Sequence, residues 1–405
     1  MILSVCIPNY ERLDLLTRLV SFCCVLIEKD SLYEQVEICV SDDCSSNDPT
    51  EAVHKIVEQF PSVCIKYKRN ETNLGMDHNF LQSVMMASGR YAWIIGNDDM
   101  PTDNSLSIIM DVLKRYPALD FLVSPFDAYS YTGEYKCTVY PLKEHDRELI
   151  FDTTAEGELS KLIYMVEGNT AFFDFLSNVV FLRKNWVDRG DFFKEKMNSI
   201  FIQIYMNLQS LKEGAVYVYS PGKIIRQYLD KETNSTYKRR FAIVKGLDEV
   251  VNYFFAGSEN RYLHNVWVDL FVTGMLFDVG EDTPEMEFLR SVGSDRVELY
   301  VKYFVKTSDR KSIFRKKRVV ICGAGVYGRK CIEELRELDA DIMFFCDRDE
   351  SKQRKSIEGI PVKPYSALYD PEAKPDYVLA ANKKQLCEMV KELEENGIYN
   401  IAVFD

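Results

Sequence analysis

Polar and acidic residues follow each of four apolar, strand-like segments near the start of the chain. The segments are 3–7, 36–40, 63–67 and 91–95, and the motifs that follow them are Pro8-Asn9-Tyr10-Glu11-Arg12, Ser41-Asp42-Asp43-Cys44-Ser45, 69–75 and Gly96-Asn97-Asp98-Asp99. Short clusters of Asp, Asn, Ser and Gly are ordinary turn residues, so one such motif is weak evidence. Four motifs at the ends of neighbouring strands predict one converging polar site.

The last of these motifs has the residue types of a divalent-cation site. Carboxylate oxygens suit Mg²⁺ or Mn²⁺, which proteins commonly hold with one or two carboxylates and the phosphates of a substrate. Such an ion neutralises the negative charge that grows on a departing nucleoside diphosphate. We therefore expect Asp98 and Asp99 to bind Mn²⁺ or Mg²⁺ with a diphosphate, and Gly96 to leave room for that diphosphate.

The second and third motifs offer groups for the rest of a nucleotide. A carboxylate after the second strand can accept hydrogen bonds from a base N–H or a ribose hydroxyl, and Asp42 and Asp43 are the candidates. Lys68 or Arg69 can offset phosphate charge. The sequence alone does not decide between Asp42 and Asp43, or between Lys68 and Arg69.

The elements that must position these motifs alternate between strand and helix patterns. Apolar residues recur at helical spacing at Leu13, Leu16, Val20 and Cys24, and again across 52–60 and 79–87. Strands separated by helices predict a mostly parallel sheet, in which ligands bind at the carboxyl ends of the strands. We expect Pro8 to end the first strand.

The remainder of the chain predicts two further parts. Residues 126–235 are irregular and aromatic with a strand-like segment at 178–182, residues 240–305 are helical in pattern, and 310–318 form a basic, linker-like stretch. The expected domains are therefore an α/β domain at 1–235, a helical segment and linker at 236–315, and a small Rossmann-like domain at 316–405.

The C-terminal domain contains a glycine-rich turn in a strand-turn-helix setting. Gly323, Gly325 and Gly328 follow the strand-like segment 318–322, and Asp347 ends the next strand-like segment. This context predicts a nucleotide site in which a phosphate approaches Gly325 and Asp347 accepts from ribose hydroxyls. The alternative is that the glycines serve only close packing of strand and helix.

Composition excludes some classes of protein. The chain has 405 residues and a formal net charge of −13, which argues against a general nucleic-acid binder. It shows neither a signal-peptide pattern nor an apolar run of the roughly 18–20 residues that span a membrane. Its eleven cysteines form no C-x-x-C pair. We expect a cytoplasmic protein with free thiols.

The four motifs resemble those of a known enzyme family. Segments 3–12, 40–48, 70–75 and 87–99 are similar to the successive motifs of family 2 glycosyltransferases, in particular the abequosyltransferase-like branch. The resemblance implies a GT-A fold, a nucleotide-sugar donor, a divalent metal and inversion at the anomeric carbon. It places Pro8, Tyr10, Asp42 and Asp43 around the nucleoside, and makes Asp99 a metal ligand. The expected donor-binding set is Pro8, Tyr10, Arg12, Asp42, Asp43, Arg69, Asn73, Asn97 and Asp98.

Two features depart from that family pattern. Glu11 stands where many members have Asn. The family also carries an acidic catalytic base near the start of a helix, whereas the corresponding stretch 197–205 has no carboxylate. Asp191, Glu195 and Asp174 are the candidates upstream of this stretch, and we select Asp191.

The expected function is sugar transfer from a nucleoside-diphosphate sugar to a saccharide or lipid-linked saccharide acceptor, in surface polysaccharide or glycoconjugate biosynthesis. We therefore expect the protein to act at the inner face of the membrane and to contact the membrane peripherally. A sugar nucleotidyltransferase is disfavoured because the segment 8–12 has no glycine. A non-catalytic nucleotide-sugar-binding scaffold is the alternative; the missing base motif favours it and the intact triplet Asn97-Asp98-Asp99 opposes it.

Overall fold

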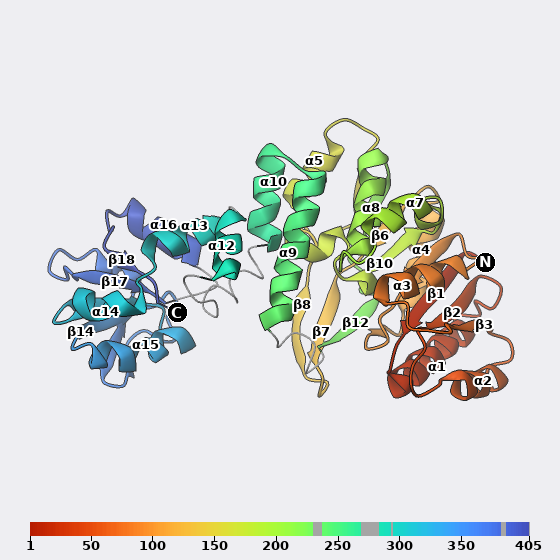
Figure 1. Ribbon diagram of the computed structural model, residues 1–405, viewed down its shortest axis with the longest axis horizontal. Helices are drawn as coiled ribbons and strands as arrows, with labels where there is room; N and C mark the ends of the chain where they lie inside the picture. The colour runs from red at the N-terminus through yellow and green to blue at the C-terminus, as the bar shows by residue number, and fades with distance from the viewer. Residues whose placement is uncertain (230–236, 269–282, 293–294, 382–385, 405) are drawn as a thin grey trace. The chain divides into compact units, whose positions relative to one another are not determined.

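The computed structural model describes residues 1–229, 237–268, 283–292, 295–381 and 386–404 (Figure 1). The chain divides into two compact units, Met1–Val266 and Trp267–Asp405. The first unit extends past the expected boundary at residue 235, because α9 (Tyr237–Phe254) packs on α8 and α10 (Gly257–Leu263) packs on α5. The structure thus shares the expected middle segment between the two units.

Among the described residues, eight strands of the first unit form a mixed sheet in the order β3-β2-β1-β4-β10-β6-β11-β9. They are β1 (Leu3–Asn9), β2 (Val36–Asp42), β3 (Cys64–Arg69), β4 (Tyr91–Ile94), β6 (Phe121–Val123), β9 (Leu149–Asp152), β10 (Val179–Leu182) and β11 (Val216–Tyr219). Parallel pairing joins β1 to β2 and β4, and β2 to β3. The four expected strands therefore end at one edge of the sheet.

The first strand runs two residues further than the sequence predicts. All seven residues of β1 are buried, as expected for a parallel strand covered on both faces. It continues through Pro8 to Asn9 because the proline breaks no ladder bond. The carbonyl of Cys6 accepts from Ile95 on the β4 side, and Pro8 faces that same side beyond the end of β4.

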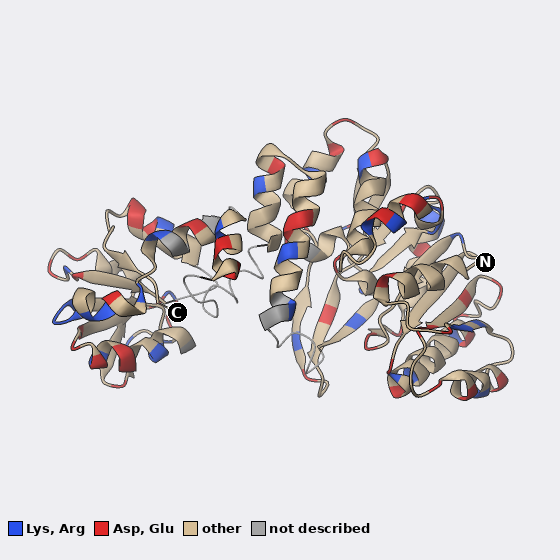
Figure 2. Cartoon of the chain, in the orientation of Figure 1, with Lys and Arg blue, Asp and Glu red and all other residues tan. Residues whose placement is uncertain are grey.

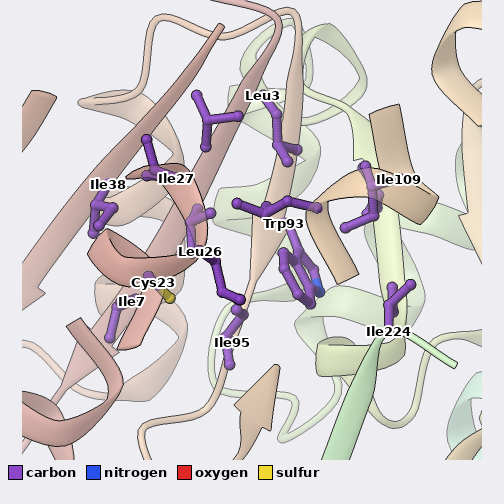
Figure 3. Packing of buried hydrophobic residues seen from close by; sticks show 14 of the residues in the cluster. Leu3, Ile7, Cys23, Leu26, Ile27, Ile38, Trp93, Ile95, Ile109 and Ile224 are labelled. Atoms are coloured by element: carbon purple, nitrogen blue, oxygen red, sulfur yellow. The ribbon is translucent and has the colours of Figure 1, made fainter. Parts of the chain in front are cut away.

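The helices of this half are α1 (Leu13–Lys29), α2 (Thr50–Gln59), α3 (Met76–Met85) and α4 (Ser105–Arg115). α1 buries Leu16, Leu19, Cys23 and Ile27, which recur at helical spacing. Figure 3 shows Cys23, Leu26 and Ile27 of α1 packed with Leu3, Ile7 and Trp93 of the strands. Burial of each aliphatic side chain contributes roughly 1.5–3 kcal/mol to the free energy of folding, so this core holds α1 firmly against the strands.

A buried acid in β2 ties the strands together at the opposite end. The carboxylate of Glu37 accepts from Ser4 Oγ at 2.6 Å and pairs with Lys66 Nζ at 2.8 Å. Burial alone would raise the pKa of Glu37, but the bonds from Lys66, Ser4 and Ser88 outweigh it and lower the pKa to about 2. A Cβ at Gly89 would lie 2.6 Å from Ser4 Oγ, so this turn before β4 requires glycine.

A second sheet begins directly after the acidic triplet. Its described strands have the order β5-β12-β7-β8, with β5 (Met100–Pro101), β7 (Phe126–Ser130), β8 (Tyr135–Val139) and β12 (Ile225–Leu229). The other elements of the first unit are α5 (Glu158–Met165), η1 (Asn169–Phe172), η2 (Leu176–Asn178), α6 (Lys184–Val187), α7 (Gly190–Lys196), α8 (Ile202–Glu213) and η3 (His264–Val268). Because β12 pairs antiparallel with β5, this sheet lies beside the triplet.

The second unit is a smaller α/β sheet flanked by helices. Its described strands have the order β15-β16-β14-β13-β17-β18, and β13 lies parallel to both β14 and β17. The strands are β13 (Arg318–Cys322), β14 (Asp341–Cys346), β15 (Ser356–Ile357), β16 (Ile360–Lys363), β17 (Tyr377–Ala380) and β18 (Ile401–Ala402). The helices are α12 (Pro284–Ser291), α13 (Asp295–Tyr303), α14 (Thr307–Phe314), α15 (Val326–Glu337), η4 (Tyr365–Leu368) and α16 (Leu386–Glu395). The expected strand-turn-helix around the glycines is present.

Acidic and basic side chains are interspersed along the elements of both units (Figure 2). No helix in the described part of the chain combines the length and apolar character needed to cross a bilayer.

Candidate active site

The side chain of Asn9 joins three of the four predicted motifs. It is 1% exposed, and its Nδ2 donates to Asp42 Oδ1 at 2.7 Å. Its Oδ1 accepts from Asn97 Nδ2 at 2.7 Å, and its backbone carbonyl accepts from Asn79 Nδ2 at 3.1 Å. Asn9 therefore holds four elements together. Its side chain links β1 to the end of β2 and to the loop after β4, and its backbone carbonyl contacts α3.

Asp42 is a fully buried carboxylate with partners inside the chain. Besides Asn9, its oxygens accept from Ser45 Oγ at 2.5 Å and Ser45 N at 3.1 Å. Arg69 Nε lies 3.4 Å from Asp42 Oδ2, and Arg69 Nη2 donates to the carbonyl of Ser45 at 2.8 Å. These contacts shape the turn after β2, and the predicted contact of Asp42 with a nucleoside stays a prediction.

Asp43 holds the third motif in a similar way. Its carboxylate accepts from Asn70 Nδ2, Leu74 N and Gly75 N, each at 2.9 Å. Asn73 is exposed and its Oδ1 also accepts from Gly75 N, at 2.9 Å. The loop before α3 is thus folded around a carboxylate that is only 3% exposed.

Two residues beside this turn adopt left-handed backbone conformations. Glu11 has φ 59° and Cys44 has φ 61°, a region that Asn tolerates better than most residues. Glu11 replaces the Asn of the family pattern, and its carboxylate accepts from both Ser46 N and Ser46 Oγ at 2.7 Å. These bonds explain how Glu11 is kept at this position. Tyr10, next to it, is 47% exposed, whereas Pro8 is buried.

The carboxylates of Asp98 and Asp99 converge at the end of β4. A Cβ on Gly96 would lie 2.9 Å from Asp98 Oδ1 and 3.3 Å from Asp99 Oδ2. Asp99 is 4% exposed and accepts from Ser177 Oγ at 2.6 Å. The absence of a side chain at Gly96 therefore makes room for the two carboxylates, and the expected role of Gly96 toward a diphosphate stays a prediction.

This donor set fits a divalent cation. Burial and the neighbouring charge of Asp98 raise the pKa of Asp99 well above its ordinary value, outweighing the hydrogen bond from Ser177. Two converging carboxylates repel each other, and a divalent cation is the partner that would relieve this repulsion. The described residues include no cluster of three or more Asp, Glu, His or Cys side chains suited to a metal. Phosphate oxygens are the usual additional ligands of Mg²⁺ and Mn²⁺.

A cavity of about 360 Å³ opens beside the triplet. Arg12 lies at its wall, where its Nη1 is 2.5 Å from Asp98 Oδ2 and 3.4 Å from Asn97 Oδ1. The other lining residues are Leu15, Arg18, Asp98, Tyr131, Thr132, Gly133, Tyr228 and Leu229. Two guanidinium groups and two tyrosine rings give this cavity the chemistry to receive an anionic, partly apolar ligand.

The three candidate bases lie in different environments. The side chain of Asp191 is fully exposed on α7 and pairs with Lys194, and that of Glu195 is 61% exposed. Asp174 is partly buried and lies three residues before Ser177, so the two Cα atoms are within about 11 Å. Gln203, near the start of α8 where the family has an acid, donates to the carbonyl of Asp174 at 3.4 Å. This placement favours Asp174 over the predicted Asp191.

The glycine turn of the second unit serves packing at one end and is open at the other. A Cβ on Gly328 would lie 1.9 Å from the carbonyl oxygen of Gly323, so Gly328 is required for packing. A Cβ on Gly325 would meet nothing within 4 Å. Asp347 already accepts from Ala324 N at 2.8 Å and from Lys352 Nζ at 3.2 Å. The predicted ribose contact of Asp347 stays untested.

Sequence reasoning missed several residues that build the site. Ser177, Asn79 and Asn70 each bond a motif residue from a distant part of the chain. Asn9 and Asn70 lie inside the motifs 8–12 and 69–75. An amide close to several carboxylates could have indicated their role. Ser177 lies within the short 3-10 helix η2, directly before β10, and carried no such signal.

The chain is similar to known glycosyltransferases. The profile of the family described as Glycosyl transferase family 2 matches residues 4–176, a range that holds all four motifs. Abequosyltransferase RfbV of Salmonella typhimurium is 38% identical over 113 residues, which make up 28% of this chain and 33% of the relative. The matched region thus spans about a third of that curated relative. The predicted similarity to family 2 glycosyltransferases is confirmed over residues 4–176. The α/β arrangement predicted for this region is present in the structure.

Solved structures with a similar arrangement include two glycosyltransferases. S. aureus TarS 1–349 in complex with UDP-GlcNAc has a TM-score of 0.46 and 14% identity, covering 77% of this chain and 78% of that one. Mannosyltransferase PcManGT from Pyrobaculum calidifontis, in complex with GDP-Man and Mn²⁺, has a TM-score of 0.44 and 13% identity, covering 71% and 78%.

The Asn9 amide generates a prediction. Asn9→Ala removes one hydrogen bond of Asp42, which keeps its bonds from Ser45, and takes away the acceptor of Asn97 Nδ2. Leaving a buried polar group unsatisfied costs roughly 1–3 kcal/mol. We expect a loss of unfolding free energy in urea denaturation, and a larger loss for Asn9→Asp, which adds a charge beside Asp42. Asn104→Ala, at the start of α4, is the matched control. Stability of Asn9→Ala equal to that of the control would contradict the role of Asn9.

Proposed function

We propose that this chain, whose residues 4–176 belong to glycosyl transferase family 2, transfers a sugar from a nucleoside-diphosphate sugar to a hydroxyl group of an acceptor. The observation that carries the proposal is the convergence of Asp98 and Asp99 beside the strand ends that Asn9 holds together. TarS and PcManGT have been solved in complex with UDP-GlcNAc and with GDP-Man, and we propose a donor of this class for the present chain.

The proposed donor lies along the carboxyl edge of the sheet. Tyr10 offers an exposed ring for the nucleobase, and Asp42 and Asp43 keep the surrounding turns in shape. Arg69 borders the same turn as a partly exposed cation. Arg12 faces the cavity beside the triplet, where its guanidinium suits a phosphate.

We propose that Asp98 and Asp99 hold Mn²⁺ or Mg²⁺ together with the donor diphosphate. The bound cation would neutralise the charge of the leaving diphosphate. Ser177 fixes the orientation of Asp99 through a 2.6 Å hydrogen bond. Arg12 holds Asp98 on the cavity side. Preorganised charges of this kind cost no reorganisation during the reaction.

The transfer we propose inverts the anomeric carbon and needs a group that accepts the proton of the attacking hydroxyl. Asp174 is the carboxylate that the structure favours, because the segment 174–178 is tied to the triplet through Ser177. Gln203 fixes the backbone of Asp174 from the other side. A saccharide or a lipid-linked saccharide is the proposed acceptor, and a cytoplasmic location at the inner face of a membrane stays a prediction.

The non-catalytic scaffold remains the competing hypothesis, because the stretch 197–205 has no carboxylate. Slow hydrolysis of the donor without acceptor separates the two, since a scaffold binds the nucleotide sugar and leaves it intact.

For the second unit we propose a nucleotide site at the glycine turn. Gly325 is the residue before α15, and open space lies in front of it. A helix N-terminus approached through glycine favours phosphate. Packing alone accounts for Gly328, as shown above, but not for the open position at Gly325.

The metal and donor generate the first prediction. A panel of nucleotide sugars that includes UDP-GlcNAc and GDP-mannose, screened by thermal shift with and without Mn²⁺, should identify the donor through the stabilisation that binding causes. Asp99→Asn should then lower donor hydrolysis at least ~10²-fold, because charge neutralisation is worth several kcal/mol. Asp111→Asn, a surface change on α4, should leave the rate unchanged. Full activity of Asp99→Asn, or full activity of the wild type in excess chelator, would contradict the proposed metal role.

The choice of base generates the second prediction. Asp174→Asn should lower the turnover number by about 10²–10⁴-fold, the typical contribution of a general base. Asp191→Asn should keep wild-type turnover, because the side chain is fully exposed on α7. The reverse pattern in the same rate assay would return the assignment to Asp191.

The glycine turn generates the third prediction. Gly325→Val places its side chain in open space, so the fold should survive while a phosphate is blocked. Calorimetric titration of the full chain with ATP, UDP and UDP-GlcNAc should show one class of nucleotide sites lost in this variant. Asp99→Asn, combined with Gly325→Val, separates this site from the donor site. Identical titrations for wild type and Gly325→Val would leave the turn with a packing role only.

A further inference from the structure

A buried carboxylate at the start of α3 contacts a strained loop of the other half of the domain. Asp77 is 5% exposed, and its Oδ2 accepts from the backbone N–H of Asn198 at 2.7 Å. Asn198 and Ile200 both have left-handed backbone conformations, with φ 66° and 68°. A β-branched residue rarely adopts this region. Such conformations persist only where their surroundings hold them, and they cluster at functional sites.

The strained loop is held from a second side by α9. A Cβ on Gly246 would lie 2.9 Å from the ring of Phe201 and 3.5 Å from the carbonyl of Ser199. The backbones of α9 and the loop therefore approach closely, which requires glycine at 246. The loop 197–201 is fixed between Asp77 and α9 immediately before α8 begins at Ile202.

The same loop leads to the proposed base. Gln203 lies in the first turn of α8, two residues after this loop, and donates to the backbone carbonyl of Asp174 at 3.4 Å. On the other side of Asp77, Gly75 directly precedes α3, and its N–H donates to Asp43 at 2.9 Å. A continuous series of contacts thus runs from the turn after β2, through the first turn of α3, to the segment that carries Asp174.

We propose that Asp77 is a positioning residue that couples the loop folded around Asp43 to the loop before α8, and through Gln203 sets the place of Asp174. This inference rests on the proposed function. A carboxylate suits this task because it accepts more than one backbone N–H, which an apolar side chain cannot do. Burial raises the pKa of Asp77, while the hydrogen bond from the backbone of Asn198 and the charge of the neighbouring His78 act against that shift.

A purely structural role of Asp77 would have a different effect on stability and on the kinetic constants. Removing a buried carboxylate leaves the N–H groups that it accepted from without a partner, which costs stability. If Asp77 served the fold alone, its loss would lower stability and leave the kinetics of the folded fraction unchanged. If it positions Asp174, the turnover number falls while the Michaelis constant for the donor stays the same.

The test uses the full chain, with hydrolysis of UDP-GlcNAc and of GDP-mannose in Mn²⁺ as the rate assay. Asp77→Ala should lower kcat at least tenfold at unchanged KM, and Asp77→Asn, which still offers one acceptor oxygen, should recover part of that loss. Glu51→Ala, an exposed acid in the first turn of α2, is the matched control. Equal kcat for Asp77→Ala and the control would overturn the proposal.

Hydrogen exchange on the same variants reports the loop independently of the donor. The amides of Asn198 and Ser199 should lose at least tenfold protection in Asp77→Ala, while those of β1 and β2 keep theirs. If Asp77→Ala does not fold, Ile200→Gly replaces it, because glycine adopts the left-handed backbone freely and loosens the loop. Unchanged exchange overturns the proposal. A wild type that hydrolyses neither nucleotide sugar counts against the proposed function, and exchange then decides the role of Asp77.

Discussion

The site depends on the pairing of one buried amide, that of Asn9, with a carboxylate on one side and a second amide on the other. An amide carries both a donor and an acceptor, so it can satisfy Asp42 and Asn97 at once, whereas an ionised carboxylate has no proton to donate to Asp42. Buried polar groups must be paired, and this pairing therefore fixes the relative positions of β1, β2 and the loop after β4. The acidic triplet is placed by that constraint.

Four neighbouring carboxylates take different roles because their surroundings differ. Asp42 and Asp43 are surrounded by N–H and O–H donors from the adjoining turns and act as anchors for those turns. Asp98 and Asp99 face each other across the space left by Gly96, and burial raises the pKa of Asp99. The first pair shapes the turns of the proposed nucleotide site, and the second pair has the chemistry to bind a cation.

Near the site, specific hydrogen bonds connect segments of the first unit that lie far apart in the chain. Ser177 bonds Asp99, Gln203 bonds the backbone of Asp174, and Asp77 bonds Asn198. Each bond crosses between segments far apart in the chain, and each involves a residue that would be ordinary in isolation. The strained backbone at Asn198 and Ile200 shows that these contacts hold the loop in a conformation it would not adopt alone.

The sequence by itself determined the alternation of strands and helices and the edge at which the motifs meet, because apolar periodicity and turn residues are local signals. It also located the triplet and the glycine turn. Only the tertiary structure decided that Asp42 and Asp43 already have hydrogen-bond partners, that Pro8 does not end β1, that Asp191 faces solvent and that Ser177, three residues after Asp174, bonds Asp99. These facts depend on pairings between distant residues, such as Asn9 with Asn97, and no local pattern records which distant groups folding brings within hydrogen-bond distance.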